Sequence, residues 1–286
     1  MVSIVIPAHN ESEVIARTLD AIMRDAAPGE FEIIVVCNGC SDSTAAVARG
    51  FGPAVHVIEC PVAGKPNALN LGDDAARAFP RIYIDADVIV TTNSIRALAD
   101  RLGQGDVLAV APRQKFELTD CSRAVRAYYA VQSRLPSSRE GIGGSGVYAL
   151  SELGRRRFGR FPAVTADDGY VRIQFAANER ATIAGAQSIV FAPRRLEDLV
   201  AIKSRSHFGN HELARLYPKL WPNRGPSNRR SLLRLFANPL MWPSLAVFCW
   251  VAIEARRRAR NRQRSNQQIW TRDQSSRIGS LRPAED

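Results

Sequence analysis

Short apolar runs alternate with amphipathic stretches through the first 112 residues of the chain. The runs are rich in β-branched residues and predict strands, and the stretches between them have the period of helices. Strands and helices in alternation indicate βαβ units and therefore a doubly wound α/β sheet. The expected strands lie at 2–7, 32–37, 54–59, 81–84 and 106–112, and the expected helices at 12–26, 42–49, 65–78 and 93–102, with Ser12 and Asn93 as N-caps.

The remainder of the chain changes in composition twice. Helical patterns predominate between residues 113 and 220, with helices expected at 120–134, 168–177 and 196–217, and a glycine-rich turn at 141–146 precedes a short strand. A linker rich in Pro, Gly, Asn and Arg then leads into an apolar segment and a charged tail. We therefore divide the chain into 1–112, 113–220, a basic and apolar helical segment at 221–262, and a tail at 263–286 that is expected to be disordered.

Polar residues follow the expected strands, and ligands of open parallel sheets bind outside the carboxyl ends of the strands. Asp85 and Asp87 are candidate ligands of a hard divalent cation, although a polar loop is the alternative reading of so short a pattern. Lys65 lies at an expected helix start, where a phosphate is favoured by both the lysine and the helix N-terminus. The sequence therefore predicts a site for a diphosphate and a metal at one rim, formed by residues 7–11, 38–42, 61–65 and 85–87.

Five ordered motifs resemble those of family-two glycosyltransferases with the GT-A fold. They are VSIVIPAHNES, IIVVCNGCSDST, GKPNALNLG, YIDADV and TADDGY, spread over residues 2–170. The resemblance implies a GT-A-type, Rossmann-like mixed sheet, mostly parallel and flanked by helices, with a C-terminal helical extension. It also implies that residues 1–112 form the half that binds the nucleotide sugar, and that residues 113–220 form the half that binds the acceptor and supplies the catalytic base.

The resemblance further implies roles for the rim residues. Asp87 is the principal ligand of Mg²⁺ or Mn²⁺, with Asp85 as its partner toward the metal or the ribose. Asn38 stands where the family's D-G-S-x-D loop has its first acid, so we expect a different nucleotide preference. The chain has no Q-x-x-R-W motif, which disfavours processive polymer synthesis. The expected nucleotide-sugar contacts are Pro7, Ala8, Asn10, Glu11, Asn38, Asp42, Lys65, Asp85 and Ala86.

Asp167 and Asp168 would begin a helix, where a pair of capping carboxylates is the alternative interpretation. The resemblance makes Asp168 the candidate general base and Asp167 its supporting neighbour. We expect inverting transfer from a nucleotide-diphosphate sugar to a hydroxyl of a glycan or lipid-linked acceptor. One alternative is a nucleotidyltransferase of similar fold, although its Gly-rich basic first loop is missing here, and another is a catalytically inactive binding protein.

Three further patterns have competing interpretations. The run GIGGSG matches a dinucleotide fingerprint, but a strand follows it and none precedes it, so we assign Gly143, Gly144 and Ser145 to the acceptor site. Cys37 and Cys40 form a C-x-x-C without a second pair, so zinc or redox chemistry is not expected. The basic residues Lys203, Arg205 and His207 are candidate diphosphate contacts; His207 and His211, four apart, suit a solvated helix face better than a metal site.

The net charge of +11 is concentrated near the C-terminus, where residues 224–262 contain nine arginines and one acid, Glu254. Because this charge flanks an apolar run, it favours a membrane surface over nucleic acid. The run at 239–253 is shorter than the roughly twenty residues of a spanning helix, so we expect an interfacial or re-entrant anchor and peripheral membrane contact through 232–262, the alternative being a helix packed on the domain. Five scattered cysteines and no leader predict a cytoplasmic protein at the inner face of the membrane.

Overall fold

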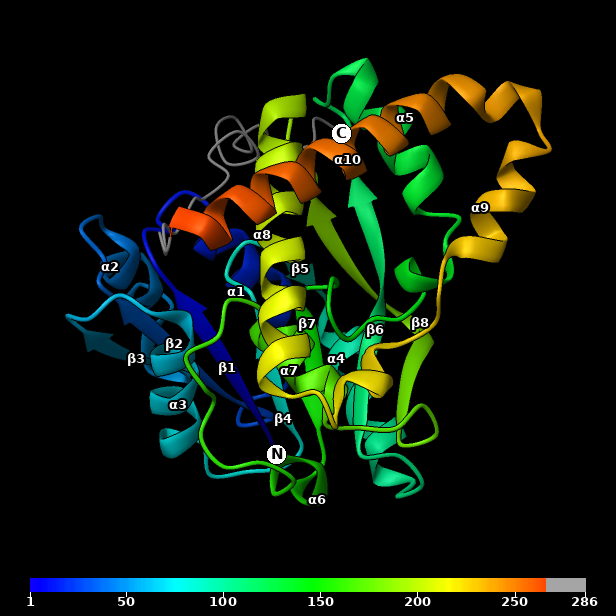
Figure 1. The fold of residues 1–286 in the computed structure, drawn as a ribbon. Helices are drawn as coiled ribbons and strands as arrows, with labels where there is room; N and C mark the ends of the chain where they lie inside the picture. The colour runs from blue at the N-terminus through cyan, green and yellow to red at the C-terminus, as the bar shows by residue number, and fades with distance from the viewer. Residues whose placement is uncertain (266–286) are drawn as a thin grey trace.

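The protein is built around one eight-stranded sheet with helices on both faces (Figure 1). The computed structural model describes residues 1–265. The sheet has the strand order β3-β2-β1-β4-β7-β6-β8-β5. Its strands are β1 (Val2–Ala8), β2 (Phe31–Asn38), β3 (Val55–Cys60), β4 (Arg81–Ile84), β5 (Ile89–Val90), β6 (Ala109–Glu117), β7 (Val147–Leu150) and β8 (Arg180–Phe191).

The pairing makes the sheet mixed, as the family resemblance implied. β3, β2, β1 and β4 are parallel neighbours, whereas β7 runs antiparallel between β4 and β6. β8 is parallel to β6 and antiparallel to β5. In the register of β1 and β2, Ala8 lies opposite Cys37, so the loops after these two strands begin side by side.

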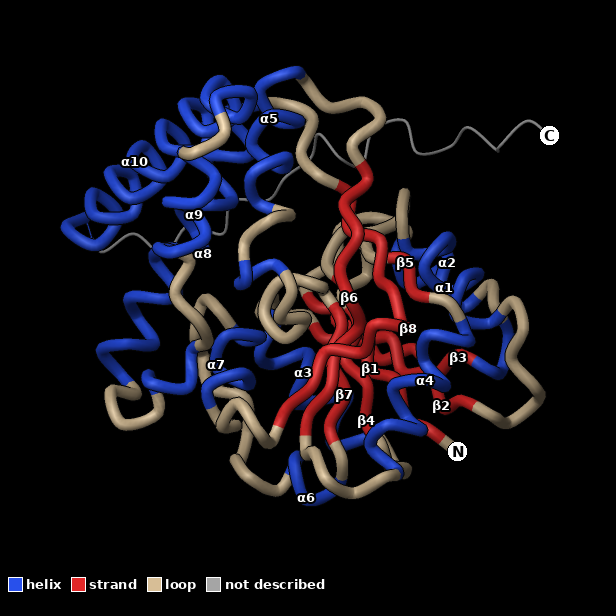
Figure 2. The backbone as a smooth tube through the Cα atoms, turned by 90° about the vertical axis from the view of Figure 1, so that its right-hand side faces the viewer, coloured by secondary structure: helices blue, strands red, loops and turns tan. Residues whose placement is uncertain are grey.

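Alternate residues of the strands supply two separate cores. Ile4 and Ile6 pack with α1, α2 and α4 on one face, and Val5 packs with α3 and α7 on the other. This arrangement is visible in the side view of Figure 2, where the sheet lies between these two sets of helices. The helices are α1 (Ile15–Met23), α2 (Thr44–Arg49), α3 (Lys65–Ala75), α4 (Thr92–Gly103), α6 (Glu152–Arg155) and α7 (Asp167–Ile173).

A third core lies beside the sheet, where α5 (Arg123–Gln132), α8 (Leu196–Leu216) and α10 (Trp242–Ser265) pack together. These helices and α9 (Arg229–Phe236) form a separate block in Figure 2. Within residues 1–265 no single helix has the length and hydropathy to cross a bilayer; the segments Trp221–Phe236 and Pro239–Arg262 pass that test only as a pair bent by 114°. Short 3₁₀ turns lie at Gly52–Ala54, Pro136–Ser138, Trp221–Arg224 and Pro239–Met241.

The five expected strands are confirmed, but several details differ from the sequence predictions. β8 was not predicted, because its pairing with β6 shifts register between Pro112 and Arg113 and its exposure does not alternate regularly. Neither predicted N-cap is correct: Val14 precedes α1, and the Thr91 side chain caps α4 by accepting from the Ser94 amide. The tail expected to be disordered was 263–286. Residues 263–265 belong to α10, and residues 266–286 lie outside the described part of the chain.

Candidate active site

The loops after β1 and β2 are tied to each other by polar side chains. Asn10, with φ of 51°, occupies the left-handed region that asparagine tolerates better than most residues. Its side-chain oxygen accepts from the Ser41 amide at 2.7 Å, and Asp42 in return accepts from the Ser12 amide at 3.1 Å. The two loops therefore support each other's conformation before any ligand binds.

Asn38 joins three of the rim loops. It is 3% exposed, its Nδ2 donates to the Ala8 carbonyl at 2.7 Å, and its Oδ1 accepts from the Gly64 amide at 2.9 Å. A carboxylate could not donate to Ala8, so the structure gives a physical reason for an amide at this position. Because Gly64 immediately precedes α3, Asn38 also fixes the place where Lys65 begins that helix.

Two acids of these loops share one partner, Thr44. The Glu11 amide donates to the Thr44 hydroxyl at 2.7 Å, and Asp42 accepts from the Thr44 amide at 3.0 Å. Partial burial opposes ionisation of Asp42, but the hydrogen bonds from Thr44 and from Ser12 outweigh it and lower the pKa of the carboxyl. The two loops thus present a buried Glu11 after β1 and an ionised Asp42 after β2.

Lys65 connects two motifs that lie far apart in the sequence. Its ammonium is 2.8 Å from Asp85 Oδ1 and 3.0 Å from Asp167 Oδ2. Burial favours loss of the Lys65 charge, but the carboxylates of Asp167 and Asp85 outweigh it and raise the pKa of the ammonium. Burial likewise raises the pKa of Asp167, and Lys65 opposes that shift. The site therefore holds a half-buried cation between two acids.

The backbone of the D-x-D motif is held on both sides. The Asp85 amide donates to the Gly146 carbonyl at 2.8 Å, the Ala86 carbonyl accepts from Thr18 at 2.8 Å, and the Asp87 carbonyl accepts from Arg17 at 3.1 Å. Two carboxylates with oxygen donors suit Mg²⁺ or Mn²⁺. Residues 1–265 contain no cluster of three or more His, Cys, Asp or Glu side chains arranged to hold a metal. A cation here would therefore need further oxygen ligands from a phosphate and from water.

Asp167 and Asp168 open α7 but do not cap it. The N-cap is Ala166, without a side-chain bond, so neither acid is the N-cap, although both lie in the first turn, where the helix dipole favours a carboxylate. Asp167 is buried and turned toward Lys65, whereas Asp168 is partly exposed and accepts from the Gly169 amide at 2.6 Å. The two neighbouring acids thus have different environments, and only Asp168 is left accessible to a substrate hydroxyl.

Two contacts that sequence reasoning missed hold the segment before α7. Asn70 of α3 makes a pair of hydrogen bonds to the backbone of Phe161, at 3.0 and 2.8 Å. Glu212 of α8 accepts from the Thr165 amide at 2.8 Å. The only sequence signal was the position of Asn70 within GKPNALNLG, because the long-range partners of Asn70 and Glu212 cannot be read from local patterns.

The glycine-rich loop at 141–146 crosses from the D-x-D motif toward α7. A Cβ on Gly146 would lie 3.3 Å from Asp85 Oδ2 and 2.5 Å from Val88, so only glycine fits there. The Ser145 hydroxyl is buried, 2.7 Å from the Gly141 carbonyl and 2.6 Å from that of Val147. Ser145 therefore stabilises the loop, while Gly143 and Gly144 are the accessible members of the predicted acceptor site.

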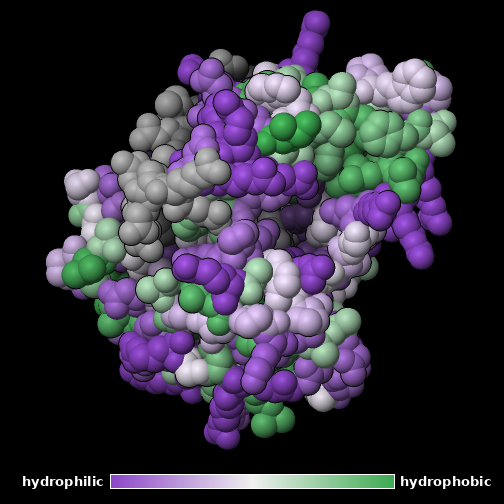
Figure 3. All heavy atoms as spheres, in the orientation of Figure 1, coloured by the Kyte–Doolittle hydropathy of each residue, from purple (hydrophilic) through white to green (hydrophobic). Residues whose placement is uncertain are grey.

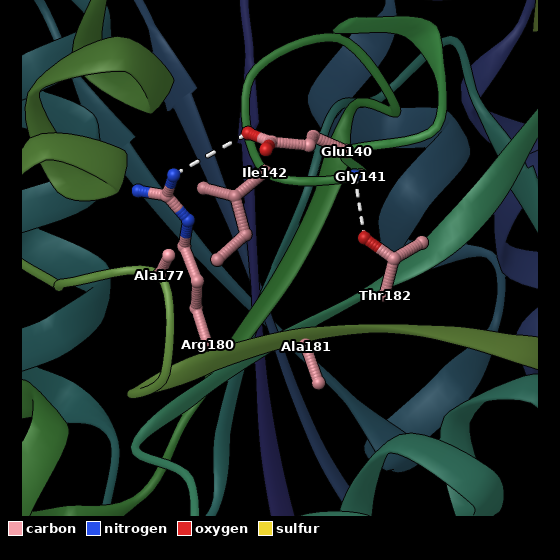
Figure 4. Close-up of a pocket in the computed structure, with 7 residues that line it drawn as sticks. All are labelled: Glu140, Gly141, Ile142, Ala177, Arg180, Ala181 and Thr182. Atoms are coloured by element: carbon pink, nitrogen blue, oxygen red, sulfur yellow. Dashed lines mark hydrogen bonds and ion pairs between the residues drawn. The ribbon is translucent and has the colours of Figure 1, made fainter. Parts of the chain in front are cut away.

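A pocket of about 160 Å³ lies behind this loop, at the N-terminal part of β8 (Figure 4). The Glu140 carboxylate and the Arg180 guanidinium face each other across it at 3.4 Å, and the Gly141 amide donates to Thr182 at 2.9 Å. The pocket shares no residue with the predicted nucleotide-sugar site. Its lining consists of Glu140, Gly141, Ile142, Ala177, Arg180, Ala181 and Thr182.

The candidate diphosphate residues of α8 lie against other helices. The Lys203 ammonium is 5.5 and 5.9 Å from the ring centres of Tyr128 and Tyr129 on α5, and burial lowers its pKa to about 8. Burial also lowers the pKa of His207, with the charge of Arg256 contributing. Contact of Lys203, Arg205 and His207 with a diphosphate stays a prediction.

Two glycosyltransferases of known structure are similar to this chain in fold. A mannosyltransferase from Pyrobaculum calidifontis, solved with GDP-Man and Mn²⁺, is similar over 90% of this chain and 86% of its own, with a TM-score of 0.64 and 20% identity. Glucosyl-3-phosphoglycerate synthase from Mycobacterium tuberculosis, solved with Mn²⁺, UDP and phosphoglyceric acid, is similar over 75% of this chain and 78% of its own, with a TM-score of 0.55 and 20% identity. At these identities the likeness establishes the fold, which confirms the GT-A prediction.

Residues 3–143 match the model of glycosyl transferase family 2, in agreement with the motif resemblance. Glycosyltransferase AglE from Haloferax volcanii is 33% identical over 91 residues, which are 30% of this chain and 30% of that protein. The 4,4'-diaponeurosporenoate glycosyltransferase of Staphylococcus aureus is 31% identical over 118 residues, or 38% of this chain and 31% of that protein. The chain thus spans less than a third of the length of these two curated relatives.

Proposed function

We propose that this protein transfers a sugar from a nucleotide-diphosphate donor to an acceptor hydroxyl with inversion at the anomeric carbon. The observation that carries the proposal is the pairing of Lys65 with both Asp85 and Asp167. It joins the helix start that suits a phosphate, the D-x-D motif and the acid pair in one site. Nucleotidyl transfer and a binding protein without activity are the alternatives to be tested.

On the donor side, the chain supplies groups that bind the nucleotide and stabilise the leaving diphosphate. The loops after β1 and β2 would hold the base and ribose through Asn10, Glu11 and Asp42, and Lys65 would place its charge beside the diphosphate. Asp87 and Asp85 would hold Mg²⁺ or Mn²⁺, and such an ion neutralises charge on phosphate oxygens. Charge stabilisation at the leaving group is usually the largest contribution to this kind of catalysis.

On the acceptor side, the different environments of the acid pair assign the base. Asp167 is buried and ion-paired with Lys65, so its carboxylate is not accessible to the hydroxyl of an acceptor. Asp168 is accessible and lies on the next residue of α7. We therefore assign to Asp168 the removal of the proton from the attacking hydroxyl. A single displacement by that hydroxyl, on the side opposite the leaving diphosphate, inverts the anomeric centre.

The ligands named for the structural neighbours agree with this assignment. One neighbour was solved with GDP-Man and Mn²⁺, and the other with UDP, Mn²⁺ and phosphoglyceric acid. These ligands support a nucleoside diphosphate donor and a divalent metal for this chain. The acceptor that we propose is a glycan or a lipid-linked molecule at the cytoplasmic face of the membrane.

Membrane contact is proposed from the segment that runs from α9 into α10. One side of α10 is buried on α5 and α8, as expected if the helix packs on the domain. However, α9, the turn before α10 and the first half of α10 expose large apolar side chains. Figure 3 shows this apolar patch at the upper right, with hydrophilic residues around it. Arginines of α9 and α10 would complement an anionic leaflet. The exposed apolar residues are Leu233, Phe236, Leu240, Trp242, Trp250 and Ile253.

Flotation with anionic vesicles tests this contact. We expect wild type to float, and the double variant Leu233→Asp, Phe236→Asp to remain in the soluble fraction. Leu153→Asp, at an equally exposed leucine on α6, is the matched control and should float. Wild type that never floats would contradict the membrane proposal without affecting the enzymatic one.

A panel of nucleotide sugars tests the enzymatic proposal. Donors that bind should raise the melting temperature in the presence of Mg²⁺ or Mn²⁺, because a ligand stabilises the state that binds it. With an acceptor extract, the stabilising donor should be consumed, release a nucleoside diphosphate and give a product of opposite anomeric configuration by NMR. In a parallel assay with a nucleoside triphosphate and a sugar 1-phosphate, release of pyrophosphate would indicate a nucleotidyltransferase. Binding of donors without turnover in either assay would indicate an inactive binding protein.

A further inference from the structure

Arg172 lies on α7 one helical turn after Asp168, the proposed base. Residues four apart on a helix project from the same face, with their Cβ atoms about 5–6 Å from each other. A group bound by Arg172 would therefore lie close to a hydroxyl that faces Asp168. Neither local sequence patterns nor the motif resemblance assigned any role to this arginine.

The guanidinium of Arg172 lies against the glycine-rich loop. A Cβ on Gly143 would be 3.2 Å from Nη1 and 3.3 Å from Cζ of Arg172, and the φ of 92° at Gly143 also favours glycine. The next residue, Gly144, has a φ of 147°, and a Cβ there would be 3.1 Å from Gln114 Oε1. The loop predicted to bind the acceptor is thus shaped around Arg172 and Gln114.

Arg172 has no counterion among the described residues. Its Nε is buried without a hydrogen-bond partner, and no carboxylate of residues 1–262 forms an ion pair with it. Other arginines of this region are paired: Arg180 with Glu140 at 3.4 Å, and Arg155 with Asp73 at 2.6 Å. A partly buried guanidinium without a partner is costly, so its presence at this site points to a ligand that pairs with it.

The surroundings add positive charge. Arg180 donates to the Arg172 carbonyl at 3.0 Å, so the two arginines are neighbours. Burial lowers the pKa of Arg180, with Glu140 opposing and the charge of Arg172 contributing. Glu140 is paired with Arg180, so the charge of Arg172 is not balanced by a carboxylate in the described part of the chain. The fork of guanidinium donors fits the oxygens of a phosphate or a carboxylate.

We propose that Arg172 binds an anionic group of the acceptor, so that the acceptor is a phosphorylated or carboxylated molecule whose charge lies within a few bonds of the attacking hydroxyl. This inference rests on the proposed function, because Asp168 defines where that hydroxyl lies. It narrows the acceptor from glycans and lipid-linked molecules in general to acidic ones.

Three small probes test the inference: glycerol 3-phosphate, glycerate and glycerol, which carry hydroxyls on similar chains with a phosphate, a carboxylate or no charge. They are titrated calorimetrically into protein whose donor site is filled with Mn²⁺ and the nucleoside diphosphate that stabilises it most. We expect wild type to bind one or both anionic probes more tightly than glycerol. Preference for one of the two anions identifies the charged group of the acceptor.

Arg172→Gln should weaken binding of the preferred anion about 10-fold or more, the usual effect of losing a charged hydrogen bond. Arg172→Lys, which keeps the charge but loses the fork, should be intermediate. Arg156→Gln, at an exposed arginine paired with Glu152, is the control and should bind as wild type does.

Equal binding of all three probes to wild type, or unchanged anion binding in Arg172→Gln, would overturn the inference. If wild type binds no nucleoside diphosphate when the donor site is filled, the result would instead contradict the proposed function. A failure of the inference and a failure of the proposed function are therefore distinguishable.

Discussion

The two sides of the site differ in how far their polar groups are satisfied. On the donor side, Asn38 has partners for both side-chain atoms, and the loops after β1 and β2 are joined through Asn10 and Asp42. On the acceptor side, Arg172 Nε and the Tyr148 hydroxyl are buried without a partner in the described part of the chain. We infer that the donor loops hold their binding conformation without ligand, whereas the acceptor side is completed by its substrate.

Lys65 lies at the boundary of the two sides. It pairs with Asp85 of the donor side and with Asp167 of the acceptor side, so one charge supports both. Tyr148, which stacks on Tyr83 at 4.9 Å, has its pKa raised by burial and by the charge of Asp167. Electrostatic coupling thus links the buried groups of the acceptor side to the donor side through Lys65 and Asp167.

The largest effect is expected from Asp87→Ala. If Asp87 is the principal metal ligand, as proposed, its removal should lower sugar transfer about 100-fold or more, because stabilisation of the leaving diphosphate is lost. The measurement is the initial rate of transfer at saturating donor across a titration of Mn²⁺. Full metal-dependent activity in this variant would show that the D-x-D motif does not bind the metal through Asp87.

Asn38→Asp is expected to have a smaller effect, on stability. The carboxylate would lose the hydrogen bond to Ala8 and lie against a carbonyl oxygen while buried, which should cost about 1–3 kcal/mol of the free energy of unfolding. Denaturant unfolding measures the change. If stability is unchanged and nucleotide preference shifts instead, Asn38 acts by contacting the base rather than by holding the donor loops.

The smallest effect is expected from Lys203→Met on α8. The Lys203 pKa of about 8 lies below its value in the unfolded chain, so the partly buried charge destabilises the folded protein in full below pH 8. This cost disappears as pH rises through about 10.4, where the unfolded chain also loses the proton. We therefore expect Lys203→Met to be more stable than wild type by ~1 kcal/mol at pH 7, with the difference vanishing above pH 10.

Two measurements on Lys203→Met decide what this cation does. Unfolding by denaturant at pH 7 and pH 10 gives the stability difference, and an unchanged stability at both values would mean that the charge is already balanced. Weaker donor binding by the variant would support the contact of Lys203 with the diphosphate, and unchanged binding would remove it from the site.

Local patterns predicted the strands of the donor side well, because these strands are regular, and the proposed donor contacts lie mainly in the loops that follow them. The acceptor side depends on contacts between distant segments. β8 pairs with β6 in an irregular register. Asn70 and Glu212 bind backbone groups that are distant in the sequence, and the Nε of Arg172 has no hydrogen-bond partner in the described residues. The predicted N-caps were also wrong. α1 begins at Ile15, three residues after Ser12, and Thr91 caps α4 in place of Asn93.

The most direct test of the central claim compares Asp168→Asn with wild type under single-turnover conditions. The claim is that Asp168 removes the acceptor proton at a site whose donor side is already formed. Sugar transfer should fall about 10²- to 10⁴-fold, as expected for loss of a general base, while the dissociation constant for the nucleotide sugar stays within about 2-fold of wild type. Sugar transfer by Asp168→Asn at the wild-type rate would contradict the assignment of Asp168 as the base. Weaker donor binding with an unchanged rate of transfer from the enzyme–donor complex would contradict it too.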